Sequence, residues 1–167
     1  MTVAPLVCRD LDRADPAPRV AFDIRPFSER DDRAAVARLA ACVGAAAGPA
    51  PRPAGLMAEL RERPGRRVAC WMAWPRTPDD TLSAAGPCGF VTLVEAHDRA
   101  GRARWSIGWL LVHPAARRQG LARALVATAL NQARTAGAAE VFTETSSLWP
   151  AAAFWQAVGF TSVREGN

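Results

Sequence analysis

Apolar residues recur along the chain with two spacings, which separate expected strands from expected helices. Alternation of apolar and polar positions is typical of strands with one buried face. It predicts strands over residues 22–27, 66–74, 89–96, 103–112 and 139–145. Apolar positions three and four residues apart are typical of helices. They predict helices over residues 33–43, near 56–62, over 118–136 and in a last segment that closes at 160.

Residues at the ends of these segments add detail. Asp31 or Asp32 would cap the first helix, and Gly137 would end the helix over 118–136. Trp105 and Trp109 lie in one expected strand at an even spacing, so they would share a face. One of them is therefore a candidate for lining a substrate pocket.

The 167 residues predict one domain preceded by a short extension. Residues 1–20 carry charges and prolines and are expected to be loosely attached, with a short strand over 5–8 as an option. Residues 21–167 would form a single α/β domain. Residues 44–55, rich in Ala, Gly and Pro, are expected to be a flexible connection, and residues 75–87 a polar loop.

Composition narrows the classes of function. Half of the residues are hydrophobic, but no apolar run approaches about 18 residues, so no membrane span is expected. The first residues lack the cationic start and long apolar stretch of a signal peptide, and a cytoplasmic location is expected. The cysteines and histidines have no metal-ligand spacing, so no metal is expected.

The net charge of +5 does not by itself indicate a nucleic-acid partner. All 21 basic residues are arginine, and they are scattered among acidic residues from Arg9 to Arg164. No basic stripe alternates with aromatic residues, so no nucleic-acid partner is expected. The chain also has no tyrosine, which removes one common proton donor.

The joint between strand 103–112 and helix 118–136 carries the candidate chemistry. Its sequence over residues 112–122 is Val-His-Pro-Ala-Ala-Arg-Arg-Gln-Gly-Leu-Ala. A glycine beside arginines at a helix N-terminus leaves amides open where the helix dipole is positive, which favours a phosphate or pyrophosphate. Gly120 would let that group reach the backbone, because glycine has no side chain. A surface turn with solvated charge is the alternative interpretation.

Two segments resemble signature motifs of the GNAT superfamily of N-acetyltransferases. Residues 117–122 fit its (Gln/Arg)-x-x-Gly-x-(Gly/Ala) pattern, and Val112-His113-Pro114 stands where that family carries Val-x-Pro. Residues 154–160, Phe-Trp-Gln-Ala-Val-Gly-Phe, resemble a helix that closes in aromatic-x-x-x-Gly-Phe, the family's other hallmark. The resemblance covers residues 21–160 loosely and 105–160 closely.

The resemblance implies an α/β fold with a mixed, mostly antiparallel central sheet, flanked by helices and splayed at the cofactor-binding strands. Only residues 161–167 follow Phe160, where relatives usually add a longer final strand. Either the N-terminal extension or a partner subunit in a homodimer would then cover the far edge of the sheet, since an open edge invites pairing.

The resemblance also implies acetyl-CoA as co-substrate. The backbone of Leu110, Leu111 and Val112 would hold the pantetheine arm like an added strand, and an amide near Leu111 would polarise the thioester carbonyl. The pyrophosphate would lie on the loop and first helical turn, formed by Arg117, Arg118, Gln119, Gly120, Leu121, Ala122 and Arg123.

Acetyl transfer to an amine further needs a base and a proton for the departing thiolate. Glu144 and Glu95 are the candidate bases, and Glu144 is preferred because it is near the end of its strand. A chain of ordered water is the alternative base. A solvated or salt-bridged surface carboxylate is the alternative role for either residue. Trp155 stands where many relatives have the tyrosine that protonates the thiolate, but an indole keeps its proton at neutral pH. Ser146 or Ser147 would relay a proton instead, or the thiolate leaves unassisted. Trp155 would then be an apolar wall of the acyl pocket.

These residues predict an acetyl-CoA-dependent N-acetyltransferase that works by direct attack in a ternary complex. The acceptor would be a primary amine of a small molecule or of a peptide or protein N-terminus. A non-catalytic acyl-CoA sensor is the alternative, because the tyrosine is missing. A basic nucleic-acid-binding module is a third hypothesis, drawn from net charge alone.

Overall fold

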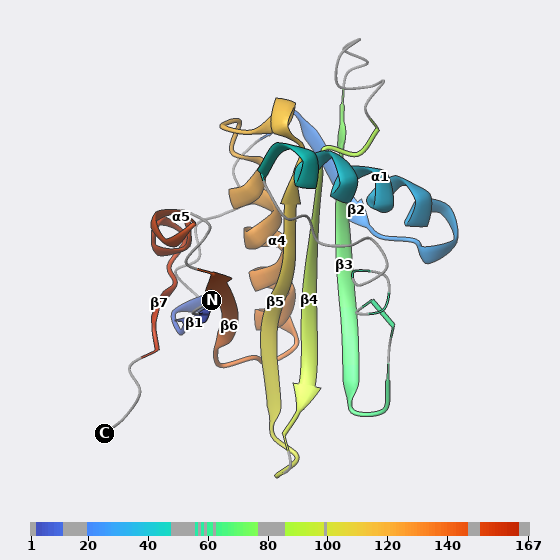
Figure 1. Cartoon of the computed structure of the whole chain (residues 1–167). Helices are drawn as coiled ribbons and strands as arrows, with labels where there is room; N and C mark the ends of the chain where they lie inside the picture. Colours follow the sequence, from blue (N-terminus) through green and yellow to red (C-terminus); the bar gives the residue numbers. More distant parts are fainter. Residues whose placement is uncertain are drawn as a thin grey trace.

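The computed structural model describes residues 3–11, 20–47, 56, 58, 60–61, 63–76, 86–98, 100–146 and 151–163. They form a seven-stranded sheet of order β2-β3-β4-β5-β6-β1-β7 with helices around it (Figure 1). The strands are β1 (Val3–Cys8), β2 (Phe22–Pro26), β3 (Arg66–Pro75), β4 (Gly89–His97), β5 (Ala103–Val112), β6 (Val141–Ser146) and β7 (Thr161–Ser162). The helices are α1 (Glu29–Ala47), the 3-10 turn η2 (Pro114–Ala116), α4 (Leu121–Thr135) and α5 (Ala152–Ala157).

All neighbouring strands are antiparallel except β5 and β6, which are parallel. The predicted mixed, mostly antiparallel sheet is therefore confirmed. The five predicted strands all occur, and β5 has the predicted bounds. The central strands β3, β4 and β5 are nine or ten residues long, which gives a hydrophobic pattern enough positions to show.

Both long helices begin at residues other than those predicted. Helix α1 begins at Glu29 instead of residue 33, because the amides of Asp31 and Asp32 donate to the carbonyl of Ser28 at 3.2 and 2.8 Å. The two aspartates therefore lie in the first turn and do not precede it. Helix α4 begins at Leu121 instead of residue 118.

Some predicted segments lie wholly or partly outside the described residues. In the expected helix near 56–62, Leu56 and Ala58 are helical and the amide of Leu60 donates to the carbonyl of Leu56 at 3.1 Å. Most of the expected connection 44–55 and loop 75–87 is not described. No helix in the described ranges is long and apolar enough to cross a membrane.

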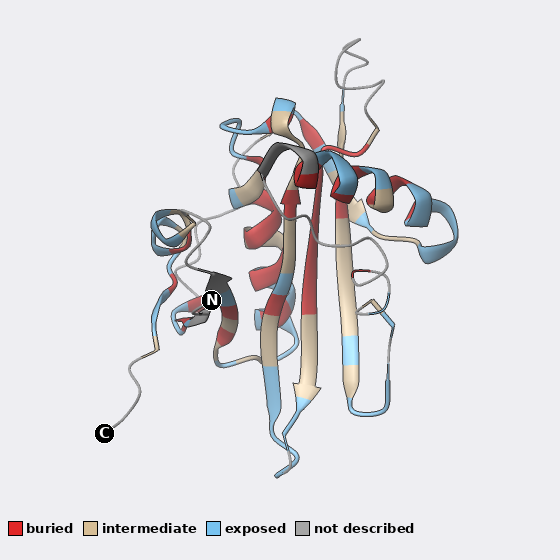
Figure 2. Ribbon diagram, viewed as in Figure 1, coloured by how far each residue is buried: buried red, intermediate tan, exposed pale blue. Residues whose placement is uncertain are grey.

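Helices α1 and α4 pack on opposite faces of the sheet (Figure 1). Side chains alternate between the faces of a strand, so Val91 and Leu93 of β4 pack in the core under α4, whereas Phe90 and Leu111 pack under α1. Figure 2 shows that burial is concentrated where the helices lie, while the far ends of β4 and β5 are less buried. That uncovered end leaves room for a groove.

A bulge in β5 changes which of its side chains share a face. The register with β4 shifts at Thr92, so that Gly108 and Trp109 together face that residue. The Oγ1 atom of Thr92 accepts a hydrogen bond from the amide of Trp109 at 2.7 Å, and a Cβ at Gly108 would lie 2.9 Å from this oxygen. The expectation that Trp105 and Trp109 share a face was wrong, because an inserted residue reverses the alternation. Trp105 packs on the α4 core and Trp109 on the α1 core.

Strands β5 and β6 separate beyond this bulge. They pair only over residues 105–107 and 141–143, although β5 continues to Val112 and β6 to Ser146. Figure 1 shows β5 running on past β6. The predicted splay is confirmed, and among the described strands none pairs with the β6-facing edge of residues 108–112.

The N-terminal segment supplies a strand in the middle of one half of the sheet. Strand β1 pairs with β6 along all of its residues and with β7 through Leu6 and Val7. Of the two expected ways to cover the edge of β6, the structure therefore contains the N-terminal one. Each backbone group of β6 on that side gains a ladder partner, which removes an edge open to other chains.

Candidate active site

The N-terminus of α4 is reached through a loop that local contacts hold. The Nδ1 atom of His113 accepts from the amide of Ala115 at 3.3 Å, which caps the turn η2. The side-chain amide of Gln119 donates to the carbonyl of Ala115 at 3.0 Å. Arg118 (φ 64°) and Gly120 (φ 77°) both have left-handed backbone conformations. Such residues turn successive amides toward one side, which makes a concavity that suits an anion.

Amides of the first turn of α4 lack helical acceptors. The first helical bond runs from the amide of Ala124 to the carbonyl of Gly120 at 3.0 Å, so the amides of Leu121 and Ala122 have no acceptor within the helix. Gly120 stands at the centre of this cradle with φ in the region that favours glycine. The donor set therefore fits a phosphate or pyrophosphate.

Charge around the loop favours the same ligand. Arg117, Arg118 and Arg123 are exposed around the loop and in the first turn, and α4 has no acidic residue in that turn. The N-terminus of a helix is the positive end of its dipole, so it repels arginine side chains unless a bound anion lies between the arginines and the helix. This arrangement favours an anion site over a surface turn with solvated charge.

The open edge of β5 leads away from the loop. The amides of Trp109 and His113 donate toward β4, at 2.7 and 2.8 Å. Amide direction alternates along a strand, so the amide of Leu111 also points to β4, and those of Leu110 and Val112 point to the open edge. Leu110 and Val112 can therefore bind an extended ligand as a further strand would. The side chain of Leu111 is buried under α1.

A groove of about 530 Å³ lies at the splay, on the sheet face where α1 packs. Its ionisable lining residues are Arg66 of β3, Arg104 of β5 and Glu144 of β6, and its aromatic ones are Trp109 and Phe142. Glu144 is exposed and directly follows the last residue of β6 that pairs with β5. Its carboxylate therefore lies where the two strands begin to separate.

The other two predicted catalytic residues lie elsewhere or are not described. Glu95 faces a separate cavity on the α4 side, which it lines with Trp105. Its side chain is 15% exposed and is 3.8 Å from both Nη1 of Arg67 and Nε2 of His97. The structure does not bring Glu95 and Glu144 together, and Ser147 lies outside the described residues.

The aromatic-x-x-x-Gly-Phe segment forms a helix end. The amide of Phe160 donates to the carbonyl of Trp155 at 2.9 Å, and that of Gly159 (φ 93°) donates to Gln156 at 3.1 Å. This is a Schellman motif, in which a hydrophobic contact accompanies the two bonds. Trp155 supplies that contact: it is 6% exposed, and its ring lies edge-on to Phe154 (5.2 Å) and Phe160 (5.0 Å). Its contact with an acyl group stays a prediction.

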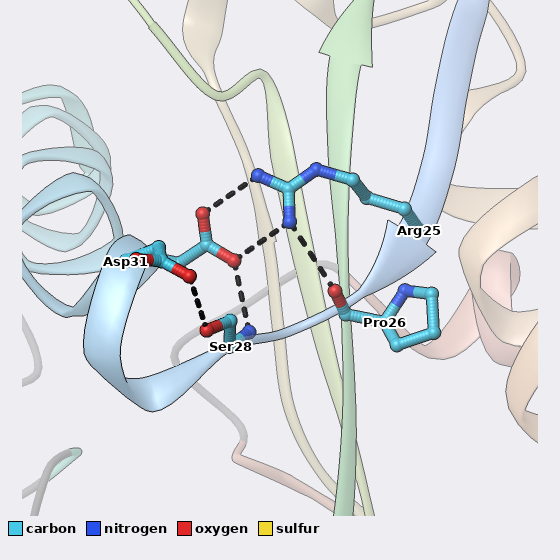
Figure 3. A network of polar contacts seen from close by, with 5 residues as sticks. Arg25, Pro26, Ser28 and Asp31 are labelled. Carbon is cyan, nitrogen blue, oxygen red and sulfur yellow. Dashed lines mark hydrogen bonds and ion pairs between the residues drawn. The ribbon is translucent and has the colours of Figure 1, made fainter.

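A polar network joins the end of β2 to the start of α1 (Figure 3). Arg25 donates to both oxygens of Asp32, at 2.8 and 2.7 Å. The amide of Ser28 donates to Asp32 at 2.9 Å, and the Ser28 hydroxyl to Asp31 at 2.8 Å. The guanidinium of Arg25 holds the pKa of the Asp32 carboxyl below its ordinary value. This network fixes α1 on the face that carries the groove.

Within the described ranges, neither the buried thiols nor the metal-binding residue types form a candidate site. Burial raises the pKa of the Cys70 thiol to about 12 and raises those of Cys8 and Cys88 as well, so these thiols stay protonated at neutral pH. Across the described residues, no group of three or more His, Cys, Asp or Glu side chains could hold a metal ion.

Sequence reasoning missed Arg66, Arg104 and Phe142 as lining residues of the groove. Their strands were predicted, but nothing local distinguishes these side chains from solvated surface residues. They meet only through strand register, in which Arg66 pairs with Ala96 and Ala96 with Arg104. Even spacing of Arg104 and Ser106 along β5 was the one available signal.

Comparisons with known proteins agree with this geometry. Residues 45–160 match the acetyltransferase (GNAT) family. Among proteins with curated descriptions, none matches the chain. An acetyltransferase from Trypanosoma brucei has the same fold, with a TM-score of 0.61 and 22% identity over 87% of this chain and 96% of that one.

Two further solved structures are similar. A tandem GNAT protein from the clavulanic acid biosynthesis pathway gives a TM-score of 0.69 at 18% identity, over 96% of this chain and 50% of that one. An aminoglycoside N-acetyltransferase in complex with CoA gives 0.64 at 17% identity, over 91% and 95%. At these identities the likeness shows the fold alone. The family match, which spans most of the chain and both sequence motifs, shows that the protein belongs to the GNAT family of acetyltransferases.

Proposed function

We propose that the protein transfers the acetyl group of acetyl-CoA to a primary amine by direct attack in a ternary complex. The observation that carries this proposal is the continuity of three features. The amide cradle at α4 adjoins the open edge of β5, and that edge ends at the groove that holds Glu144. A phosphate site, an extended-arm site and an acceptor site are the parts that this reaction needs.

Acetyl-CoA would supply the acetyl group as a thioester. The amides from Arg118 to Arg123, with Arg117 beside them, would hold its pyrophosphate. Leu110 and Val112 would hold the pantetheine arm through backbone hydrogen bonds, and one of these amides would polarise the thioester carbonyl. Holding two reactants in line contributes up to roughly 7–11 kcal/mol in well-oriented reactions.

Glu144 would act as the base, directly or through a water molecule. It would accept a proton from the acceptor ammonium, and the freed nitrogen lone pair would form the bond to the acetyl carbon. The carbon–sulfur bond breaks as that bond forms, the nitrogen releases its second proton to solvent, and the thiolate takes up a proton from solvent or through a serine relay such as Ser147. Trp155 would contribute apolar bulk near the acyl group but no proton.

A thiol-release assay with acetyl-CoA and a panel of primary amines tests this function. We expect thiol release that depends on the amine, with one acetylated amine found by mass spectrometry for each thiol released. One observation favours an acyl-CoA sensor instead: the chain has no tyrosine, and Trp155, at the corresponding position, is packed into the core. Tight acetyl-CoA binding without thiol release for any amine would support the sensor and refute the enzyme.

A further inference from the structure

The groove holds opposite charges at its two ends. Glu144 lies at the splay, whereas Arg66 and Arg104 lie at the far end, on strands β3 and β5. The register places Ala96 of β4 between the two arginines. Alanine has only a methyl side chain, so a space remains between the side chains of the two arginines.

Strand geometry sets the distance between these ends. Ile107 of β5 and Thr143 of β6 are partners in the parallel pair, so the next residues, Gly108 and Glu144, lie at the same height along the strands. Arg104 is four residues before Gly108, and at about 3.3 Å per residue the two levels are about 13 Å apart. An arginine side chain can shorten this gap by several ångströms, so a ligand bound at both ends needs charges roughly 7–13 Å apart.

At the arginine end, Arg104 has positive charge available for a ligand. The guanidinium of Arg104 lies over the ring of Phe142, 4.4 Å from its centroid, which orients the group along the groove wall. In the part of the chain that the structure describes, no carboxylate forms an ion pair with Arg104. Arg66 is held by a bond from its Nη1 to the carbonyl of Arg61 at 3.1 Å.

These arginines are separate from the anion site at α4. That site consists of backbone amides and Arg117, Arg118 and Arg123, none of which lines the groove. Arg66 and Arg104 face the acceptor side of the sheet, where a phosphate of the co-substrate is not expected. The acceptor is therefore the ligand that Arg104 can meet in this groove.

Building on the proposed function, we propose that the acceptor is a peptide-like amine that carries a carboxylate two to four residues from its N-terminus. The amine would lie at Glu144, the carboxylate between Arg104 and Arg66, and the intervening chain against Trp109 and Phe142. An extended peptide advances about 3.3 Å per residue, which matches the spacing of the groove. Polycationic amines would place like charge against both arginines and are expected to be poor acceptors.

Three amidated tetrapeptides with the same N-terminal residue test this proposal: Ala-Phe-Glu-Ala, Ala-Phe-Gln-Ala and Ala-Phe-Lys-Ala. Charge-assisted hydrogen bonds are about twice as strong as neutral ones, so kcat/KM for the Glu peptide should exceed that for the Gln peptide by roughly tenfold. The Lys peptide should be the poorest. Arg104→Gln should bring the Glu/Gln ratio close to one, and Arg66→Gln should reduce it.

The matched control is Arg134→Gln, which removes the same charge from the exposed surface of α4 and should keep the ratio. The preference should also fall as salt is raised. Equal kcat/KM for the Glu and Gln peptides, or a ratio unchanged by Arg104→Gln, would overturn the proposal. If no amine of the panel releases thiol, the proposed function fails; if other amines release thiol and none of the peptides does, the peptide proposal fails. Calorimetry of the same peptides with CoA present gives a second readout of the charge preference: binding of the Glu peptide no tighter than that of the Gln peptide overturns it.

Discussion

Helices α1 and α4 each follow a strand and flank the central sheet, but their N-terminal amides have different surroundings. The first turn of α1 contains Glu29, Asp31 and Asp32, and the Asp32 carboxylate accepts a bond from the amide of Ser28 at 2.9 Å. The first turn of α4 contains no acidic residue and is preceded by a left-handed glycine among arginines. The positive end of the α1 dipole therefore lies beside carboxylates of the chain itself, whereas the positive end of the α4 dipole lies at an open amide cradle.

The difference separates groups that stabilise the fold from groups that remain available to a ligand. At α1 the Asp32 carboxylate accepts from the amide of Ser28 and pairs with Arg25, so its loss should lower stability and leave ligand binding unchanged. At α4 no acidic side chain lies in the first turn, so its amides remain open to water or to an anion, and a change there should act mainly on ligand binding. Substitutions at α5 and in the groove test the same separation between residues that stabilise the fold and residues that act on a ligand.

Gly120→Val should have the largest effect, the loss of the rise in melting temperature that CoA produces. A ligand that binds only the folded state stabilises it by about 2.7 kcal/mol at a concentration 100 times its Kd. Valine disfavours φ near 77° and would place two methyl groups in the cradle. Thermal unfolding with and without CoA measures the shift.

Gly137→Val is the matched control for backbone strain. Gly137 also has a positive φ, of 86°, and open space around it, but it lies at the C-terminal end of α4. Both variants should lose similar stability without ligand, and only Gly137→Val should keep the CoA shift. A full shift in Gly120→Val would show that the cradle is not the phosphate site.

Trp155→Ala should have the next largest effect, on stability. The buried ring packs against Phe154 and Phe160 at the end of α5, and its removal should cost about 3–5 kcal/mol in the free energy of unfolding. Trp155→Phe keeps an aromatic ring and should lose much less of both stability and turnover. Urea unfolding measures the first and thiol release the second. Loss of turnover in Trp155→Phe with the fold and CoA binding intact would mean that the indole N–H takes part in the reaction.

Glu144→Gln should lower turnover on the order of 10²-fold, with little change in CoA binding. The amide keeps the size of the side chain but cannot accept the proton of the acceptor ammonium, so the rate should also lose its acidic pH limb. Glu95→Gln is the control, because Glu95 lies on the other face of the sheet. Normal turnover in Glu144→Gln together with a loss in Glu95→Gln would assign the base to Glu95.

The cradle could be predicted from the sequence because one short segment builds it. Residues 112–122 contain the strand end, the glycine, the arginines and the helix start, so their local order already defines the arrangement. The strands were equally accessible, since the three central ones are nine or ten residues long and give a hydrophobic pattern enough positions to show. The Gly-Phe ending of α5 was recognised for the same reason, as a local helix-capping pattern.

The groove could not be predicted, because it depends on pairings between distant segments. Arg66 and Arg104 meet only through the register of three strands, and register is not visible in any one of them. The bulge at Gly108 reversed the faces of Trp105 and Trp109, and it depends on Thr92 of the neighbouring strand. The early start of α1 was missed because Arg25, outside the helix, pairs with Asp32 in its first turn.

Asp32→Asn should have the smallest effect of the four and should act on the α1 side alone. Its buried carboxylate accepts two bonds from Arg25 and one from Ser28. An asparagine retains part of this pattern and loses the charge, so the free energy of unfolding should fall by about 1–3 kcal/mol. The CoA-induced shift in melting temperature should be unchanged. Asp31→Asn, at an exposed neighbouring position, should cost less.

The pH dependence of this loss gives the final test of the comparison. Arg25 lowers the pKa of Asp32 below its ordinary value of 3.8 in the folded state, so the unfolded chain binds the proton more readily. The stabilisation is therefore complete above the ordinary value and disappears as the pH falls through the lowered folded-state pKa. The stability difference between the natural protein and Asp32→Asn should be constant near neutral pH and shrink on acidification below about 4. A difference that grew on acidification would mean that Arg25 does not hold Asp32 in its charged form. The start of α1 would then have to be stabilised by contacts other than the Arg25–Asp32 pair.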